Sequence, residues 1–235
     1  MLISTFLRSN TSTRTQVLKL CRRMLSSSDK TKYKLIYFNA RAIAEVARQL
    51  FALAGQPFED VRVNPKEWPK LKREMPFEQL PVLEVDGKRI AQSYTICRFL
   101  ARRFGFAGQT PFEEAIVDSI VDQFRDYLFE TRPFLVLLIG VGDGDVETLK
   151  KTLFLPERAK LFGFMKKFLN DSKSGYLVGD SVTWADLCLA EHVGTYAELF
   201  PEMLEGYPEI KAHTDMVRSI PQLKQWIEKR PKTKF

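Results

Sequence analysis

The first apolar runs of the folded chain are short and are separated by stretches with helical spacing, a pattern typical of alternating strands and helices. The run 34–38 is apolar and aromatic and predicts a buried strand. Apolar residues at helical spacing within 40–54 predict a helix, with Asn39 as its N-cap and Gly55 as the residue that ends it. The run 58–63 then predicts a second strand.

Two more strands and a helix follow a loop that contains three prolines. The runs 81–85 and 88–91 flank Asp86-Gly87, a pair typical of a type I′ hairpin turn because both of its residues need a positive φ. The apolar stripe within 94–104 predicts the helix. Because parallel strands cross over with a right hand, this order of elements predicts a small mixed sheet faced by helices, a thioredoxin-like domain over 32–108.

From about residue 111 onward the apolar period becomes 3.6, and no further alternating run occurs. Stripes within 116–128 and 161–169 predict two long helices. Thr183 and Asp186 stand three residues apart before an apolar run, the spacing of a capping box at the start of a buried helix. We therefore expect an all-helical domain over 111–235, and the fold class is α/β plus all-α.

The positive charge of the chain is concentrated at its beginning. The sequence has 36 Lys and Arg against 29 Asp and Glu, and a net charge of +7 invites a nucleic-acid or membrane partner. The first thirty residues hold six of the basic groups and one acid, so the remainder has 30 basic and 28 acidic groups, a net charge of +2. No apolar run approaches the roughly 20 residues that span a bilayer. We expect neither a nucleic-acid nor a membrane partner.

Residues 1–31 differ in composition from the rest. They are rich in Ser, Thr and Arg, have no acid before Asp29, and place apolar residues near helical spacing between the basic ones. This composition is typical of a mitochondrial transit peptide, and a disordered tail or a segment upstream of a start at Met24 explains it equally well. We exclude this extension from the fold, and expect a cytoplasmic protein or, if the extension is a transit peptide, a mitochondrial one.

The chain shows no sequence pattern for a metal or dithiol site. Cys21, Cys97 and Cys188 are too far apart for a CxxC pair, and so few cysteines suit a reducing compartment. His192 and His213 lie 21 residues apart, which excludes a HExxH zinc helix. We predict no bound metal.

A thioredoxin-like domain without cysteines at the turn after its first strand needs another functional group there, and here Tyr37 precedes that turn. A tyrosine hydroxyl, with a pKa of about 10, is a poor base but a good hydrogen-bond donor, and such a donor stabilises a bound thiolate. A core tyrosine without a reactive role is equally consistent with this position. Gln92-Ser93 at a helix start and Leu80-Pro81 at a strand start suit an anionic, extended peptide, with Trp68 and Lys72 in the preceding loop.

Several motifs, in this order and spacing, resemble those of the sigma-class cytosolic glutathione transferases, especially their nematode branch. They are 37–41, 67–69, Pro76-Phe77, 79–87, Gln92-Ser93, Val121-Asp122 and 181–186. The likeness runs from about Lys32 to the end of the chain. It implies a homodimeric enzyme that conjugates reduced glutathione to hydrophobic electrophiles, a detoxification reaction with glutathione as co-substrate and no further cofactor.

The resemblance also implies roles for individual residues. Tyr37 would stabilise the glutathione thiolate. The peptide would be held by Trp68, Lys72, Gln79, Leu80, Pro81, Gln92 and Ser93. In that set the first two contact the glycyl end, the main chain of Leu80 pairs with the cysteinyl part before a cis Pro81, and the last two hold the γ-glutamyl carboxylate.

Two further sets of residues follow from the resemblance. Asp126 would reach the γ-glutamyl ammonium of the ligand in the partner subunit, although by pattern alone Asp118, Asp122 and Asp126 form a solvated acidic face. The hydrophobic-substrate site would be built from Phe38, Leu128, Pro133 and Phe134.

Three positions depart from the family pattern. Ile43 stands where many sigma-class proteins have an arginine that assists the thiolate, and Ala42 stands where they have a glycine. We therefore expect thiol activation to depend more on Tyr37. Arg125 stands where the members that make prostaglandin D have a further acid in a divalent-ion site, so no metal is carried over.

Other functions fit the same residues. A low-turnover protein that binds haem or other hydrophobic ligands would explain Ile43, and a glutathione-dependent prostaglandin isomerase belongs to the same class. A structural protein like the lens crystallins of this fold is disfavoured, because Tyr37, Trp68 and Gln92-Ser93 form a complete peptide site.

Overall fold

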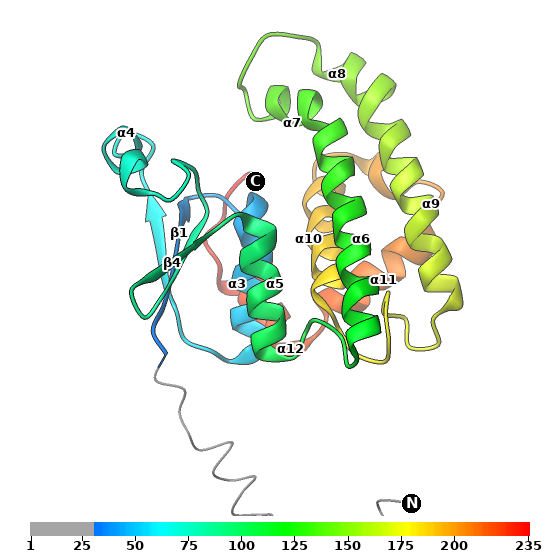
Figure 1. Ribbon diagram of the computed structural model, residues 1–235. Helices are drawn as coiled ribbons and strands as arrows, with labels where there is room; N and C mark the ends of the chain where they lie inside the picture. Colours follow the sequence, from blue (N-terminus) through cyan, green and yellow to red (C-terminus); the bar gives the residue numbers. More distant parts are fainter. Residues whose placement is uncertain (1–30) are drawn as a thin grey trace, which may run out of the picture. The chain divides into compact units, whose positions relative to one another are not determined.

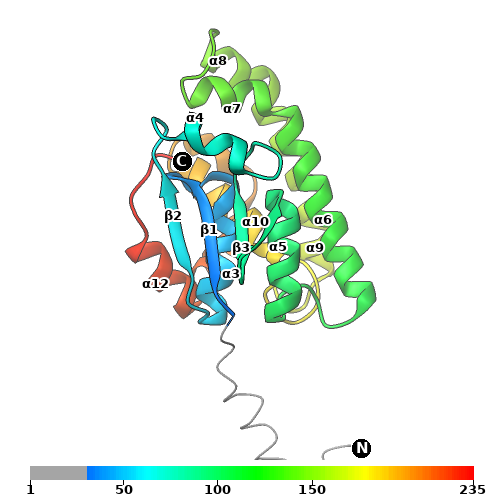
Figure 2. The same ribbon diagram turned by 60° about the vertical axis from the view of Figure 1, so that its left-hand side comes forward.

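The computed structural model describes residues 31–235, of which 33–235 form one compact unit. The interpretations of the N-terminal extension fall on residues that lie outside this description. A four-stranded sheet has the order β2-β1-β3-β4. Its strands are β1 (Tyr33–Phe38), β2 (Glu59–Val63), β3 (Val82–Val85) and β4 (Lys88–Ala91). The first two are parallel and the other neighbours antiparallel, which confirms the thioredoxin-like arrangement (Figure 2).

Two helices cover one face of this sheet, α3 (Glu45–Ala54) and α5 (Ser93–Phe104). Figure 1 shows both between the sheet and the later helices. They end as their sequence predicts, because Gly55 and Gly105 take left-handed conformations with φ of 61° and 83°. The hairpin turn is also confirmed, since Asp86 and Gly87 both have a positive φ.

The start of the first helix was predicted wrongly. Asn39 is not its N-cap: its side-chain oxygen accepts a hydrogen bond from Arg62 on β2 instead, at 2.9 Å. A 3-10 turn, η1 (Ala42–Ala44), precedes α3, whose N-cap is Ala44 without a side-chain hydrogen bond. The loop before β3 also contains a short helix, α4 (Trp68–Leu71), and a 3-10 turn, η2 (Lys72–Glu74).

The remainder of the described chain is helical, as predicted. Its long helices are α6 (Pro111–Glu130), α9 (Leu155–Asp171), α10 (Trp184–Ala197) and α11 (Pro208–Arg218). The shorter elements are α7 (Arg132–Leu138), α8 (Val146–Leu149), η3 (Lys150–Phe154), η4 (Pro201–Leu204) and α12 (Pro221–Lys229). Among the described residues, no helix is both long and apolar enough to cross a membrane.

The central helix α10 is buried on nearly all sides and contacts α3, α5, α6 and α11. It begins at the predicted capping box: the backbone N–H and the hydroxyl of Thr183 both donate to Asp186 at 2.8 Å. Its position relative to α3 is set by a buried ion network, because Arg230 donates to Glu45 on α3 at 2.8 Å and to Glu191 on α10 at 2.9 Å. The start of α10 and this network together fix the wall of the site described next.

Candidate active site

Tyr37 lies near the end of β1, just before the chain leaves the sheet. Its side chain is 8% exposed, and its ring centroid is 5.9 Å from the guanidinium carbon of Arg48. Burial raises the pKa of Tyr37 above its ordinary value, while Arg48 and the backbone N–H of Ile43 act in the opposite direction. The hydroxyl is therefore protonated at neutral pH, so it can donate a hydrogen bond but cannot serve as a base.

The pairing of β1, β3 and β4 brings several predicted glutathione residues to one end of the sheet. Ile36 pairs with Val82, and Val82 pairs with Ala91. The residues just beyond these pairs are Tyr37, Pro81 and Gln92, so they lie at the same end of three adjacent strands. The bond between Leu80 and Pro81 is cis, as the resemblance implied. Ser93 follows Gln92 as the first residue of α5.

Three further predicted glutathione residues lie in the segment between β2 and β3. Trp68 begins α4, and its ring meets the ring of Phe38 edge to face at a centroid distance of 5.5 Å. Lys72, at the start of η2, and Gln79 are both exposed. Figures 1 and 2 show α4 above the end of the sheet where β1 finishes. This end of the sheet therefore combines an aromatic ring and a cation with the free N-terminus of α5.

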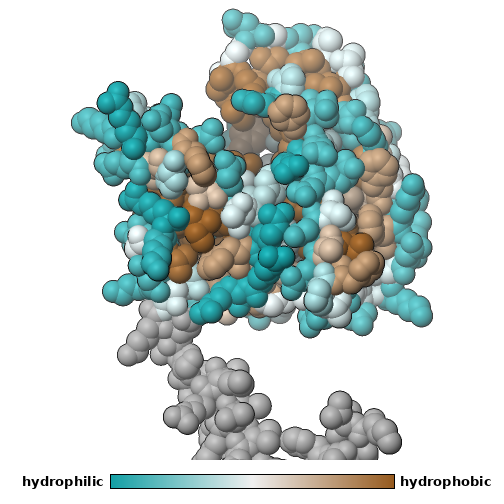
Figure 3. All heavy atoms as spheres, in the orientation of Figure 1, coloured by the Kyte–Doolittle hydropathy of each residue, from teal (hydrophilic) through white to brown (hydrophobic). Residues whose placement is uncertain are grey.

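A cavity of about 330 Å³ adjoins this end of the sheet. Ile43, whose backbone N–H hydrogen-bonds the side chain of Tyr37, lines this cavity together with Ala42 and Ser93. The apolar walls come from α5, α6 and α7 and include Cys97, Phe124, Leu128, Leu135 and Ile139. In Figure 3, apolar residues gather over α7, next to this cavity. A space of this size with mainly apolar walls suits a small hydrophobic molecule.

Of the four residues expected in the hydrophobic-substrate site, Leu128 lines this cavity. Phe38 lies beside Trp68 instead, and Pro133 is exposed on α7. Phe134 is 0% exposed and packs on Phe154 at a centroid distance of 4.5 Å, inside the helical core. The structure therefore does not bring these four side chains together around one space.

The remaining wall of the cavity was not foreseen from the sequence. It consists of Cys188, Glu191, His192, Thr195 and Tyr196 on α10, with Phe235 at the end of the chain. Phe235 is held in place because its carbonyl oxygen accepts from the backbone N–H of Arg41 at 2.7 Å. The guanidinium of Arg41 also donates to Lys234 O at 3.0 Å. The signal that was available is the pair Glu191-His192, two polar residues within a strongly apolar helix.

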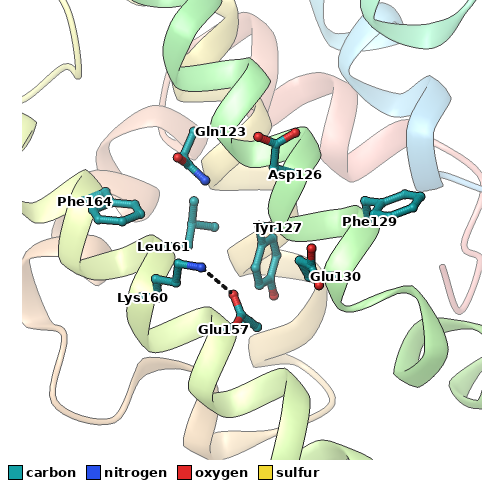
Figure 4. A pocket seen from close by; sticks show the side chains of 9 residues that line it. All are labelled: Gln123, Asp126, Tyr127, Phe129, Glu130, Glu157, Lys160, Leu161 and Phe164. Carbon is teal, nitrogen blue, oxygen red and sulfur yellow. Dashed lines mark hydrogen bonds and ion pairs between the residues drawn. The ribbon is translucent and has the colours of Figure 1, made fainter.

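Asp126 lies on α6, where its side chain pairs with Arg125 at 3.7 Å. The same arginine pairs with Asp122 at 3.5 Å, so the carboxylates of Asp122 and Asp126 share one guanidinium group. Asp126 also lines a second pocket, of about 280 Å³, between α6 and α9, together with Glu130, Tyr127 and the Glu157–Lys160 ion pair (Figure 4). Among the described residues, no group of three or more His, Cys, Asp or Glu is arranged to hold a metal ion.

Comparisons with known proteins agree with this architecture. The model of the glutathione S-transferase N-terminal domain matches residues 33–102, and that of the C-terminal domain matches residues 131–230. A Caenorhabditis elegans protein named probable glutathione S-transferase 5 is 53% identical over 207 residues, covering 86% of this chain and 99% of the relative. The chain belongs to the glutathione S-transferase family, and it is a glutathione transferase.

Solved structures show the same relationship. The crystal structure of monomeric Na-GST-3 from the hookworm Necator americanus is 60% identical, with a TM-score of 0.86, and covers 87% of this chain and 100% of its own. A structure described as a Nu-class enzyme from Haemonchus contortus is 55% identical, with a TM-score of 0.81 and the same coverage. The comparisons favour the transferase over the ligand-binding and prostaglandin-isomerase alternatives.

Proposed function

We propose that Tyr37 activates glutathione by donating a hydrogen bond from its hydroxyl to the thiolate sulfur. The observation that carries this proposal is the position of Tyr37, protonated and nearly buried at the end of β1, beside a largely apolar cavity. A donor at the sulfur favours the thiolate over the thiol, which lowers the thiol pKa from its ordinary value of about 8.5. The thiol proton leaves to solvent, and the sulfur then forms the new bond to the electrophile.

We assign the rest of the peptide site to the residues at the same end of the sheet. Trp68 and Lys72 contact the glycyl end of glutathione. Gln79 and the main chain of Leu80, before Pro81, contact its middle. Gln92 and Ser93 hold the γ-glutamyl carboxylate, where the free N–H groups and positive dipole end of α5 favour an anion. The strand register, which places Tyr37, Pro81 and Gln92 at the same end of the sheet, supports this assignment.

Replacing Tyr37 with Phe tests the activation step. We expect kcat/KM for a generic aromatic halide to fall at least tenfold, about 1.4 kcal/mol of transition-state stabilisation. The pKa of the bound thiol, followed by the ultraviolet absorbance of the thiolate, should rise. Tyr33→Phe is the matched control, because Tyr33 is also a buried tyrosine of β1 and its hydroxyl has no hydrogen-bond partner within residues 31–235. Equal activity in wild type and Tyr37→Phe would refute the assignment.

We further propose a sigma-class homodimer in which Asp126 reaches the γ-glutamyl ammonium bound by the partner subunit. The motifs shared with that class and the exposure of Asp126 on α6 support this proposal. Because one relative is described as monomeric and another as Nu-class, the test combines two measurements. Sedimentation should give the mass of a dimer, and Asp126→Ala should weaken glutathione binding. A monomer with unchanged affinity in this variant would contradict a shared site.

We propose glutathione as the co-substrate, with no further cofactor, and a cytoplasmic location. A mitochondrial location is the alternative if residues 1–31 act as a transit peptide. The composition of residues 1–31 is compatible with either location. Imaging a reporter fused to residues 1–31 distinguishes them, since import into mitochondria would contradict the cytoplasmic assignment.

A further inference from the structure

Part of the cavity wall comes from a segment without regular secondary structure. Residues 231–235 follow α12 and belong to no helix or strand, and Phe235 in this segment borders the cavity of about 330 Å³. Figures 1 and 2 show the segment at the end of the sheet where β1 finishes. It has no helical or strand hydrogen bonds of its own, so Phe235 forms a stable part of the wall only because other residues hold it.

Arg41 holds this segment with both its main chain and its side chain. Its backbone N–H donates to the carbonyl oxygen of Phe235 at 2.7 Å. Its guanidinium donates to the carbonyl oxygens of Lys234 at 3.0 Å and Thr233 at 3.4 Å. The hydroxyl of Thr233 also donates to the Phe235 oxygen, at 2.8 Å. Three consecutive carbonyl groups are thus bound to one residue, and the two bonds from the guanidinium are strengthened by its charge.

Arg41 is itself fixed in place and is only 6% exposed. Its guanidinium lies 3.6 Å from the carboxylate of Glu191 on α10, and its carbonyl oxygen accepts from the backbone N–H of Ala44 in η1 at 3.2 Å. Arg41 therefore joins three parts of the protein: the turn after β1, the buried helix α10 and residues 233–235. One residue from each part, namely Ile43, Glu191 and Phe235, borders the cavity, whereas Arg41 does not line it.

We propose that Arg41 is a positioning residue that sets the size limit for the electrophile, because it keeps the ring of Phe235 in the wall of the cavity. This inference rests on the proposed activation of glutathione at Tyr37, which places the sulfur beside this cavity. While residues 233–235 are bound, a large ring system at the sulfur meets the Phe235 ring. Without the guanidinium, the two carbonyl groups that it binds turn to water, since Lys234 is already exposed, and the ring can move out of the wall. Arg41 thus acts through Phe235 without touching the electrophile.

Two chlorides with the same reacting group measure this limit. In benzyl chloride and in 9-(chloromethyl)anthracene the thiolate sulfur bonds to the CH₂ carbon and a chloride ion leaves, so the two compounds differ in the size of their ring system. We compare kcat/KM for the anthracene compound with kcat/KM for benzyl chloride. Phe235→Ala should raise this ratio by about fivefold or more, because it removes the ring. Arg41→Met should raise it by about threefold or more, since the backbone hydrogen bond from residue 41 to Phe235 remains.

A double variant and a matched control separate positioning from a general loosening of the fold. If Arg41 acts through Phe235, adding Arg41→Met to Phe235→Ala should raise the ratio no further, whereas independent effects would multiply. Arg158→Met is the control, because Arg158 is also a buried arginine, 7% exposed, whose guanidinium donates to two backbone carbonyls, those of Met203 at 3.3 Å and Glu205 at 3.4 Å. Arg158 does not line the cavity, so this variant should leave the ratio unchanged.

An unchanged ratio in Phe235→Ala, effects that multiply in the double variant, or an equal rise in Arg158→Met would overturn the proposal. If Arg41→Met does not fold, Thr233→Val takes its place, because it removes the hydroxyl that holds the Phe235 oxygen and should raise the ratio in the same direction. Tyr37→Phe should lower kcat/KM for both chlorides and leave their ratio unchanged. Failure of the proposed activation therefore shows in the rates of Tyr37→Phe, and failure of the size limit shows in the ratio.

Discussion

Asp186 is the fully buried carboxylate at the start of α10, and replacing it with Asn should destabilise the fold by about 3 kcal/mol. Its Oδ2 accepts hydrogen bonds from the backbone N–H and the hydroxyl of Thr183, both at 2.8 Å. Its Oδ1 accepts from the backbone N–H of Leu177 at 2.8 Å and lies 2.9 Å from Nε2 of His213. An amide has one oxygen, so its NH₂ group must face one of these two sets of donors.

The magnitude follows from which donors can adapt. The hydroxyl of Thr183 and the ring of His213 can each switch from donor to acceptor, but a backbone N–H cannot. Whichever way the amide lies, one buried backbone N–H loses its acceptor. A hydrogen bond to a charged group contributes about 1.5–3 kcal/mol, and the bonds that remain weaken because the charge is gone. A loss of about 3 kcal/mol corresponds to a fall in Tm of roughly 6–12 °C for a fold of this size.

Urea unfolding and a thermal scan of Asp186→Asn measure this loss. Asp145→Asn is the matched control, since Asp145 caps α8 by accepting from the backbone N–H of Glu147 at 3.0 Å but is exposed to solvent. The control should lose no more than about 1 kcal/mol, because water replaces the lost acceptor. A loss in Asp186→Asn no larger than in the control would refute the reasoning from burial.

Two further predictions concern buried ionisable groups. Arg230→Met removes a cation within 2.9 Å of two buried carboxylates and should cost about 3–5 kcal/mol in urea unfolding at about pH 8. Burial raises the pKa of Glu191, so as the pH falls this carboxyl takes up a proton in the folded state at a higher pH than in the unfolded state. The loss should therefore shrink as the pH is lowered, and a loss that stays equal or grows would contradict this reasoning. Burial also raises the pKa of Cys97 to about 12 and that of Cys188 well above its ordinary value. In a Cys21→Ser chain, a thiol reagent at about pH 8 should therefore label neither cysteine in the native fold and both after unfolding; rapid labelling of the folded protein would argue against buried thiols.

The elements that local sequence determines were predictable. The hairpin at Asp86-Gly87 and the helix ends at Gly55 and Gly105 depend on backbone conformations that few residues adopt, so the residue type identifies them. The prediction that Asn39 caps the first helix was wrong because of a contact between residues far apart in the sequence. The side chain of Asn39 is taken by Arg62, which lies 23 residues further along and becomes a neighbour only when β1 and β2 pair.

The walls of the cavity were less predictable than the peptide site. A motif with fixed spacing marks residues at the ends of adjacent strands, whereas the cavity is closed by residues from five α-helices, the η1 turn and the end of the chain. Helix α10 is buried nearly all round, so its apolar residues form no stripe that would indicate which side borders the cavity. Phe134 was expected in the hydrophobic-substrate site but lies in the helical core. A phenylalanine on α7 suits the core as well as a cavity wall, so its residue type does not distinguish the two positions.

The isoleucine at position 43 changes what the neighbourhood of Tyr37 can do. Its side chain is 45% exposed and borders the cavity of about 330 Å³ beside the sheet, where it adds apolar surface instead of a charge. Tyr37 still has a cation nearby, since Arg48 lies 5.9 Å from its ring. That cation is fully buried and is already bound by Glu45 at 3.1 Å and Asp60 at 3.0 Å, so much of its field at the hydroxyl is cancelled. We infer that the hydrogen bond from Tyr37 carries most of the thiol activation, and that Ile43 contributes to binding the electrophile.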